Sequence, residues 1–447
     1  MKAKRIMALA AISSVILSMF LGGCGNDSGE KENVKQEENT EQNTEQNTEQ
    51  NTEKEKEKES DDKVTEVTFW GLSQQENYEP IAEAFNEEHK NIRVKISNYD
   101  TDGIKDACKV AASSKTLPNM WFNWGGSLGG FYVDNGLTYN LNDYAEEHGW
   151  KEKFNDSALN LCTYDGKISG YPSSYNILGV FYRKDVFDKY GLEVPSTFEE
   201  FESVCETLKE NGITPMYAGG LNGWHTMRYV ELLIEHYAGS KQHDEMNLFN
   251  ESYDNENVTK AFEKYKEWVD KGYFPDGFLT LDANDTLMPL ANGECAMTIE
   301  GQWQDSNIVK NGLDMEQYGA FAFPAGETNR LSSFADMIQF NADNTEEELN
   351  ACIEFIDYYF SHVLEYAENY SLPMPTKDSP MPEGQPNVEI LIKQGEENGT
   401  FTITDQAFPT EVADVLFNCQ DAIANGQMEP KEAGADIQAA IESYNNK

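Results

Sequence analysis

The strongest constraint on the fold is the order of hydrophobic patterns along residues 66–124, where short apolar segments alternate with amphipathic ones. Residues 92–97 (IRVKIS) alternate apolar and polar side chains, which is the repeat of a half-buried strand. Residues 78–85 instead place Tyr, Ile, Ala and Phe at i, i+3, i+4 and i+7, on one face of a helix. The pattern predicts strand, helix, strand, helix and strand over residues 66–71, 78–85, 92–97, 103–115 and 119–124.

Strands that alternate with helices favour a mostly parallel sheet covered by helices, because parallel neighbours need a crossover of helix length. In sheets of this kind, ligands bind beyond the carboxyl ends of the strands. The side chains at the ends of the first and third predicted strands are therefore candidates for ligand contact. They are Trp70 with Gln74 and Gln75, and Asn123 with Trp124.

The middle of the chain continues the mixture of strands and helices. Asp165-Gly166 predicts a hairpin turn, and residues 176–183 (NILGVFYR) predict a strand. Thr197 and Glu200 have the spacing of a capping box at the start of a helix. Further amphipathic helices are expected up to the C-terminus, one of them with Trp268 on its buried face.

The first 23 residues have the layout of a secretory signal peptide, with basic residues near the start and an almost uninterrupted apolar run over residues 6–21. The run ends in LGGC, residues 21–24, which resembles the lipobox of bacterial lipoproteins. We therefore predict that residues 1–23 are a lipoprotein signal peptide and that Cys24 carries a lipid anchor. An ordinary signal peptide with an incidental cysteine is the alternative.

The segment after Cys24 is composed almost entirely of polar and charged residues. Residues 25–62 repeat NTEQ and then EKEKE, they lack aromatic residues, and Val34 is their only aliphatic side chain. Such a segment buries too little apolar surface to offset the entropy lost on ordering. We predict that residues 24–62 are a lipid-anchored, disordered acidic linker.

The remaining chain is long and acidic. About 385 of the 447 residues follow the linker, which is too many for one compact core and indicates two lobes. A formal net charge of −45 disfavours nucleic acid as a partner. No second apolar run reaches the length of a membrane-spanning helix, so we expect the body of the protein outside the cell.

A search for catalytic and metal-binding motifs finds no nucleotide-binding, HExxH or GxSxG pattern. Residues 98–109 begin like a calcium loop, but Lys109 stands where a bidentate Glu is required. The cysteines after Cys24 have no C-x-x-C spacing and are expected to be buried thiols, whereas His236 and His243 are expected at the surface. We therefore expect no metal, no cofactor and no catalysis, although sequence alone leaves a glycosidase-type carboxylate pair open.

Three tryptophans lie outside every periodic apolar face. Trp124 precedes a double glycine, Trp224 belongs to AGGLNGWH, and Trp303 follows TIEGQ. Aromatic side chains in such places either pack locally or contact a ligand. Sugars suit them, because a flat ring covers the apolar C–H face while amides and carboxylates bind the hydroxyl rim.

Two longer segments carry a specific resemblance. Residues 164–215 (YDGKISGYP…YNILGVFYRKDVF…VPSTFEEF…LKENGITP) and residues 290–303 (LANGECAMTIEGQW) resemble the extracellular solute-binding proteins, family 1, of sugar-importing ABC transporters, which include the maltose-binding proteins. The likeness extends over roughly residues 66–445. It departs at Arg183, where Asn is common, and at Phe198, where Trp is common.

The resemblance implies an α/β fold with two lobes, of the periplasmic-binding-protein type II, with the ligand in a cleft between the lobes. Lobe 1 would comprise residues 63–173 and 327–362, and lobe 2 would comprise residues 174–326 and 363–447. Three hinge crossings would lie near residues 172–175, 323–326 and 362–366.

The same resemblance implies which residues contact the ligand. Gln74 and Gln75 match the family's first polar loop, and Asn123 and Trp124 match its strand-three aromatic site. Asn176 stands at a cleft position that is acidic in maltose binders, Trp224 and Trp303 match two stacking aromatics, and Asp336 lies near a crossing. The charged residues of the maltose pattern in lobe 1 are replaced here by Gln74, Gln75 and Ser127, which argues against maltose itself.

Taken together, these features predict an extracellular, membrane-anchored receptor that captures a mono- or oligosaccharide for an ABC importer. Its partners would be the sugar, the permease subunits of the transporter, and the membrane through the lipid on Cys24. A binding protein for a non-sugar solute is one alternative. A cell-surface enzyme that acts on glycosides is another.

Overall fold

The computed structural model of the chain describes residues 64–73, 78–326, 329–366, 375–379 and 384–446. Residues 61–447 form one compact unit, which is the part described below. The predicted signal peptide and linker, including Cys24, lie outside the described residues, as do the predicted ligand contacts Gln74 and Gln75.

The first part of the described chain has the predicted order of elements. They are β1 (Thr65–Leu72), α1 (Tyr78–Glu88), β2 (Ile92–Tyr99), α2 (Thr101–Ser114), β3 (Met120–Trp124) and α3 (Ser127–Asp134). β1 pairs in parallel with β2 and with β3, which confirms the predicted parallel sheet. Asp100, from the segment that resembles a calcium loop, accepts a hydrogen bond from the Gly103 amide and caps α2.

Gly125 and Gly126 connect β3 to α3 in a tight turn. Gly126 has a φ of 63°, and a Cβ at this position would collide with the backbone oxygen of Gln406. Only glycine combines this backbone angle with so close an approach. The turn therefore fixes Trp124 at the end of β3, directly beside the start of α3.

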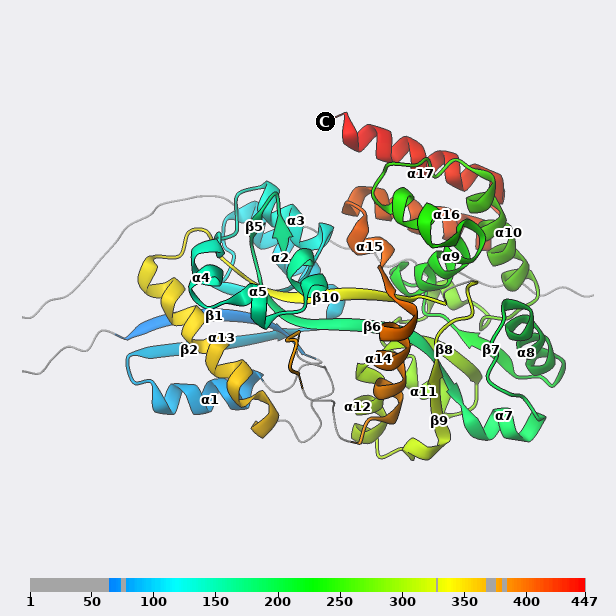
Figure 1. Cartoon of the computed structure of the whole chain (residues 1–447), viewed down its shortest axis with the longest axis horizontal. Coiled ribbons are helices and arrows are strands. Elements are labelled where there is room, and N and C mark those ends of the chain that lie inside the picture. The colour runs from blue at the N-terminus through cyan, green and yellow to red at the C-terminus, as the bar shows by residue number, and fades with distance from the viewer. Residues whose placement is uncertain (1–63, 74–77, 327–328, 367–374, 380–383, 447) are drawn as a thin grey trace, which may run out of the picture. The chain divides into compact units, whose positions relative to one another are not determined.

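Two long antiparallel strands continue the sheet through the whole described unit (Figure 1). They are β6 (Tyr171–Arg183) and β10 (Leu331–Phe340), and the strand order is β2-β1-β3-β10-β6-β8-β7. β8 (Cys295–Gly301) and β7 (Thr214–Tyr217) are parallel to each other, while β9 (Tyr318–Phe321) pairs with β6 and β11 (Thr400–Thr402) pairs with β10. The predicted hairpin at Asp165-Gly166 is confirmed by β4 (Thr163–Tyr164) and β5 (Lys167–Ile168).

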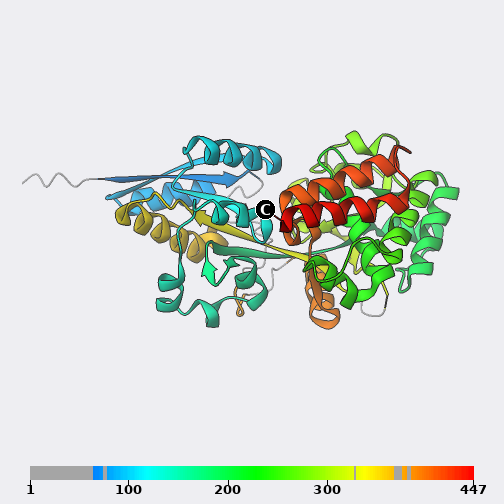
Figure 2. The ribbon, with the colours of Figure 1, turned by 90° about the horizontal axis from the view of Figure 1, so that it is seen from above.

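Helices cover both faces of this sheet, and the C-terminal ones pack against α10 in the second half of the unit (Figure 2). The capping box of Thr197 and Glu200 is confirmed at the start of α8. The remaining helices are α4 (Asn142–Glu147), α5 (Trp150–Lys153), α6 (Asp156–Leu161), α7 (Lys184–Tyr190), α8 (Phe198–Glu210), α9 (Trp224–Asn247), α10 (Glu256–Asp270), α11 (Leu287–Ala291), α12 (Trp303–Lys310), α13 (Glu346–Tyr366), α14 (Pro386–Asn398), α15 (Thr404–Ala407), α16 (Thr410–Ala424) and α17 (Pro430–Asn445). None of the helices in the described part of the chain has the length and apolar character needed to cross a bilayer.

Buried apolar residues of the described chain form three clusters, two of which lie on opposite faces of β6 and β8 and are together called the second core. The first core joins β1, β2 and β3 to α1 and α13. The second core covers both faces of β6 and β8, with α8, α9, α10, α16 and α17 on one face. β6 and β10 contribute to both cores: Tyr171 and Ile338 belong to the first, whereas Val180 and Phe334 belong to the second. The predicted lobe boundaries remain a proposal, and these two strands are where the chain passes between cores.

The predicted environments of Trp268 and the cysteines are confirmed, whereas those of the two histidines are not. Trp268 is fully buried as predicted, and its Nε1 donates a hydrogen bond to Glu202 at 2.6 Å. The described cysteines are all buried and free, also as predicted. His236 is half-buried, with its Nδ1 2.6 Å from the Ala325 oxygen and its ring stacked on Phe198. The surface position predicted for His243 is wrong, because its ring is buried and its Nδ1 lies 2.8 Å from the carboxylate of Glu235.

Candidate ligand-binding site

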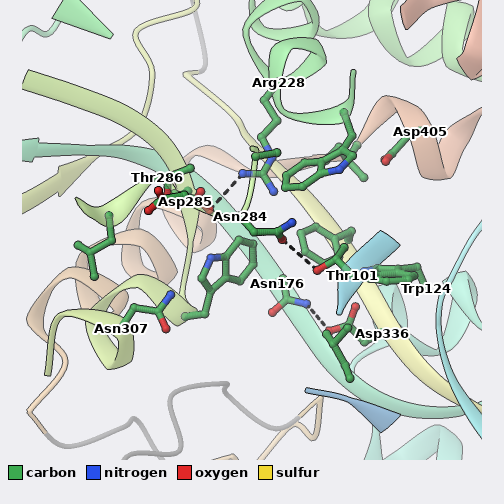
Figure 3. Close-up of a pocket in the computed structure, with 18 of the residues that line it drawn as sticks. Thr101, Trp124, Asn176, Arg228, Asn284, Asp285, Thr286, Asn307, Asp336 and Asp405 are labelled. Atoms are coloured by element: carbon green, nitrogen blue, oxygen red, sulfur yellow. Dashed lines mark hydrogen bonds and ion pairs between the residues drawn. The ribbon is translucent and has the colours of Figure 1, made fainter. Parts of the chain in front are cut away.

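A cavity of about 430 Å³ lies between elements of the first core and elements of the second core. This volume falls within the range that is usual for small-molecule sites. Figure 3 shows polar side chains that point into the cavity from several strands and helices. The first core contributes the ends of β1 and β3 and the starts of α2 and α3, and the second core contributes β8, α9, α11, α12 and α15.

The structure brings most of the described candidate residues together in this cavity. Trp124, Asn176, Trp224, Trp303 and Asp336 all contribute to its lining. These residues come from β3, β6, α9, α12 and β10, which are far apart in the sequence. Whether each of them contacts a ligand remains a prediction.

Asn123 differs from its neighbour Trp124, because it does not line the cavity. Its side chain is buried, its Nδ2 donates to Gln339 Oε1 at 2.8 Å, and its Oδ1 accepts from the Trp124 amide at 2.8 Å. Both ends of the amide are thus used inside the protein. We assign Asn123 to holding the backbone of Trp124 in place instead of to direct ligand contact.

The sequence pattern indicated that Trp224 and Trp303 lie in loops, but each is the first residue of a helix. Trp224 begins α9 directly after Gly223, whose φ is 78°. Trp303 begins α12 and packs over Gly301, where a Cβ would overlap its indole ring. The ring of Trp303 also lies against Phe334, with 5.9 Å between ring centroids.

Two cationic side chains lie over these indole rings. Lys105 Nζ is 4.8 Å from the centroid of Trp124 and 5.9 Å from that of Trp224. The guanidinium carbon of Arg228 is 4.8 Å from the centroid of Trp224 and 5.7 Å from that of Trp303. Each arrangement is within the range of cation–π attraction. Lys105 therefore interacts with the rings of Trp124 and Trp224, and Arg228 interacts with those of Trp224 and Trp303.

The guanidinium of Arg228 is held by two acceptors on β8. Its Nη1 donates to Glu300 Oε2 at 3.1 Å and to the Ile299 oxygen at 3.0 Å. His225 lies beside this pair, and burial lowers the pKa of its imidazole well below the usual value. Its Nδ1 accepts from the Gly219 amide, so the neutral ring carries its proton on Nε2, next to the Ile299 oxygen.

Asp336 and Asn176 lie side by side on the paired strands β10 and β6 (Figure 3). Asp336 Oδ2 accepts from Ser174 Oγ at 2.5 Å and from Asn176 Nδ2 at 2.9 Å. Burial raises the pKa of Asp336 to about 7, although the hydrogen bonds from Ser174 and Asn176 act in the opposite direction. The second oxygen of Asp336 and the side-chain oxygen of Asn176 are buried without a hydrogen-bond partner.

Other polar residues of the lining were not predicted from the sequence. They are Thr101, Lys105, Arg228, Asn284, Asp285, Thr286, Glu300, Ser306, Asn307, Lys310, Asn311, Asp405 and Gln406. Thr101 and Lys105 could have been found, because α2 begins at the carboxyl end of β2, where the same strand-end rule applies. Of the others, Glu300 lies near the carboxyl end of β8, and the rest come from helices and loops of the second core that carry no comparable signal. Within the described residues, no cluster of three His, Cys, Asp or Glu side chains has the arrangement of a metal site.

Comparison with known proteins agrees with this architecture. A family profile described as bacterial extracellular solute-binding protein matches residues 80–386. The multiple sugar-binding protein of Streptococcus mutans is 26% identical over 316 residues, which cover 67% of this chain and 71% of that protein. An uncharacterised ABC transporter extracellular-binding protein of Pyrococcus horikoshii is 23% identical over 271 residues, or 58% of this chain and 60% of that protein.

Solved structures show the same fold. A chitin oligosaccharide binding protein superimposes with a TM-score of 0.79 at 21% identity, over 86% of this chain and all of that one. The fold is therefore the two-lobed type II arrangement of periplasmic binding proteins, as predicted. The family profile covers well over half of the sequence, and the chain belongs to the bacterial extracellular solute-binding protein family.

Proposed function

We propose that this protein captures a carbohydrate in the cavity between its two cores and presents it to an ABC importer. The observation that carries the proposal is the convergence of Trp124, Trp224 and Trp303 on one cavity that also contains unpaired, buried polar atoms. Aromatic faces cover the C–H surfaces of a sugar ring, while unpaired donors and acceptors bind its hydroxyl groups.

The unpaired atoms include acceptors and donors. Asp336 and Asn176 each have a free acceptor oxygen, and Trp224 Nε1 and Arg228 Nε are buried donors without a partner. A hydroxyl group donates and accepts at once, so a polyol matches such a mixed set better than an aliphatic or a purely cationic solute does. The names of the similar proteins above, which include sugar and chitin oligosaccharide binding, support the same choice.

The remaining parts of the proposal concern location and partners. Family membership places the protein outside the cytoplasm, and the sequence LGGC at residues 21–24 supports a lipid anchor on Cys24. We further propose that the permease subunits of the importer receive the ligand and that the protein itself catalyses no reaction.

A thermal-shift screen of the full chain, purified in detergent, tests the proposal. Mono- and oligosaccharides are compared with amino acids and short peptides at equal concentrations. A true ligand at a hundred times its Kd adds about 2.7 kcal/mol to the free energy of unfolding. Stabilisation by amino acids or peptides alone would point to a non-sugar solute, and hydrolysis of a stabilising glycan on long incubation would point to an enzyme.

A further inference from the structure

The cationic side chains that line the cavity each interact with another group of the protein. Arg228 pairs with Glu300 at 3.1 Å, and Lys105 Nζ lies 3.8 Å from Asp102 Oδ1. Burial raises the pKa of Asp405, and the positive charges of Lys105 and Arg228 lower it in part, so these groups also interact. Lys310, the third cation of the lining, has an interaction partner as well. No cation of the described lining is therefore available to neutralise a ligand carboxylate without losing a partner.

The faces that would attract a cationic ligand are also occupied. An ammonium group binds best over the face of an indole ring. Here Lys105 lies over Trp124 and Trp224, and Arg228 lies over Trp224 and Trp303. A cationic ligand that entered between these rings would meet two positive charges of the protein at short range.

The floor of the cavity, formed by Asn176 on β6 and Asp336 on β10, contains acceptor oxygens that lack a donor. Asp336 is 4% exposed and Asn176 is 1% exposed, and each has one oxygen without a partner. The orientation of both side chains is already fixed, because Asn176 Nδ2 and Ser174 Oγ both donate to the other oxygen of Asp336. Two hydroxyl groups on one sugar ring would satisfy both free oxygens, whereas a ligand carboxylate would place its own lone pairs against them.

On the basis of the proposed function, we infer that the site selects uncharged glycans: one sugar ring donates two hydroxyl hydrogens to Asp336 and Asn176, and the corresponding sugar acids and basic amino sugars are rejected. Different groups of the protein disfavour negatively charged and positively charged ligands. The paired state of Arg228 and the free acceptor oxygens disfavour an anion, and the cations over the indole rings disfavour a cation.

The direct test measures the affinity of the full chain in detergent for five trisaccharides by calorimetry. The uncharged probes are maltotriose, xylotriose and triacetylchitotriose. The charged probes are trigalacturonic acid and chitotriose, the deacetylated amino form of the last neutral probe. We expect at least one uncharged trisaccharide to bind, and to bind at least tenfold more tightly than either charged one. Tighter binding of a charged probe than of every uncharged probe would overturn the inference, and failure of all five probes to bind would count against the proposed function itself.

A variant that changes the charge balance sharpens the test. Glu300→Gln removes the partner of Arg228 while keeping the shape of the side chain, so the guanidinium becomes available to a ligand carboxylate. We expect the affinity ratio of the bound uncharged probe to trigalacturonic acid to fall at least tenfold in this variant. The matched control is Glu294→Gln, an exposed residue directly before β8, which should keep the parental ratio.

A second variant keeps the inference testable if Glu300→Gln unfolds. Asp336→Ala removes the free acceptor oxygen, so the uncharged probe should lose at least tenfold in affinity. The melting temperature without ligand reports whether either variant is folded. A folded Glu300→Gln protein with the parental affinity ratio, or a folded Asp336→Ala protein with parental affinity, would contradict the assignment.

Discussion

Asn222 and Asp102 connect the two cores directly, because Asn222 Nδ2 donates a hydrogen bond to Asp102 Oδ2 at 2.6 Å. Asp102 lies in the first turn of α2, beside the first core, and Asn222 lies in the loop before α9 of the second core. A second bond of the same kind joins Thr101 Oγ1 to Asn284 Oδ1 at 3.1 Å (Figure 3). Both hydrogen bonds join the two cores beside the cavity, and neither involves Asn176 or Asp336.

The first prediction concerns this connection. Asn222→Ala should weaken ligand binding about two- to tenfold, because a hydrogen bond contributes about 0.5–1.5 kcal/mol and this one joins the two cores beside the cavity. The melting temperature without ligand should stay near the parental value. Calorimetry on Asn222→Ala, on Asp102→Ala and on the double variant measures the coupling between the two residues. Asn446→Ala, at the exposed end of α17, is the control. If the losses of affinity in the two single variants simply add up in the double variant, the two residues do not interact and the connection is refuted.

The second prediction separates ligand-stacking tryptophans from core tryptophans. Trp224→Ala and Trp303→Ala should each reduce affinity about ten- to hundredfold, because burying a large apolar side chain against a partner contributes about 1.5–3 kcal/mol. Their melting temperatures without ligand should remain close to parental. Trp268→Ala is the matched control: Trp268 is fully buried, so this change should cost about 3–5 kcal/mol of folding stability. Parental affinity in a folded Trp224 or Trp303 variant would return that residue to a packing role.

The third prediction concerns pH. Hydroxyl groups that donate to Asp336 favour its charged form, so ligand binding should lower the pKa of this carboxyl group, which burial raises to about 7. Affinity should therefore fall as the pH drops from 8 to 6. Without ligand the trend is opposite, because the folded chain holds this proton more tightly than the unfolded chain and gains stability over the same range.

Calorimetry at several pH values, with melting temperatures recorded in parallel, checks this prediction. The groups closest to the Asp336 carboxyl are Ser174 and Asn176, and the Cys162 thiol, whose pKa is raised by burial and by Asp336, also lies near it. Asp336→Asn should abolish most of the pH dependence of affinity between 6 and 8, whereas the melting temperature should keep a contribution from Glu231, whose pKa burial also raises to about 7. An unchanged dependence in that variant would assign the titration to another group.

The fourth prediction concerns Arg330, at the residue before β10. Its guanidinium bonds to Glu235 at 2.8 and 2.9 Å and to Asp244 at 2.9 Å, on either side of the kink at Gly239 in α9. Arg330→Met should destabilise the protein by about 3–5 kcal/mol, because it leaves the buried carboxylate of Glu235 without its main partner. Urea denaturation measures the change, with Arg93→Met on the exposed side of β2 as control. A loss below 1 kcal/mol would show that His243 alone satisfies Glu235.

The fifth prediction tests the anchor. Cys24→Ser should release the protein from the membrane into the medium, since the predicted acceptor of the lipid is removed. Fractionation of cells that express the parental and variant chains measures the distribution. Equal membrane retention of both chains would refute the lipoprotein assignment, and a conservative change within the linker, such as Asn39→Ser, should leave the parental distribution unchanged.

Much of the secondary structure was predictable because its signals are local. The alternation in β2 and the apolar face of α1 lie within single segments, and the capping box at Thr197 and Glu200 involves neighbouring residues. β6 was predicted too short, starting at residue 176 instead of Tyr171. Its first residues include Pro172, which argues against an inner strand, yet the pairing with β10 shifts register at that point and accommodates it.

The candidate site was predictable only in part, and the errors have physical causes. Asn123 and Trp124 are adjacent in a strand, so their side chains point to opposite faces and only one of them could enter the cavity. Trp224 and Trp303 resembled loop residues because a side chain in the first turn of a helix need not join its apolar stripe. Arg228 gave no signal, since its position over two indole rings depends on contacts between distant segments.

The placement of the cavity floor on β6 and β10 has a mechanical consequence. These strands run without interruption from one core to the other, and Asn176 and Asp336 lie on them where they pair. In any rotation of one core against the other about these strands, points on the axis keep their separation, while points far from it travel furthest. Asn176 and Asp336 lie close to such an axis, so rotation of one core against the other changes the distance between them least. A ligand would therefore meet the same spacing of Asn176 and Asp336 in every such arrangement, while the distances between the tryptophans of the two cores would change.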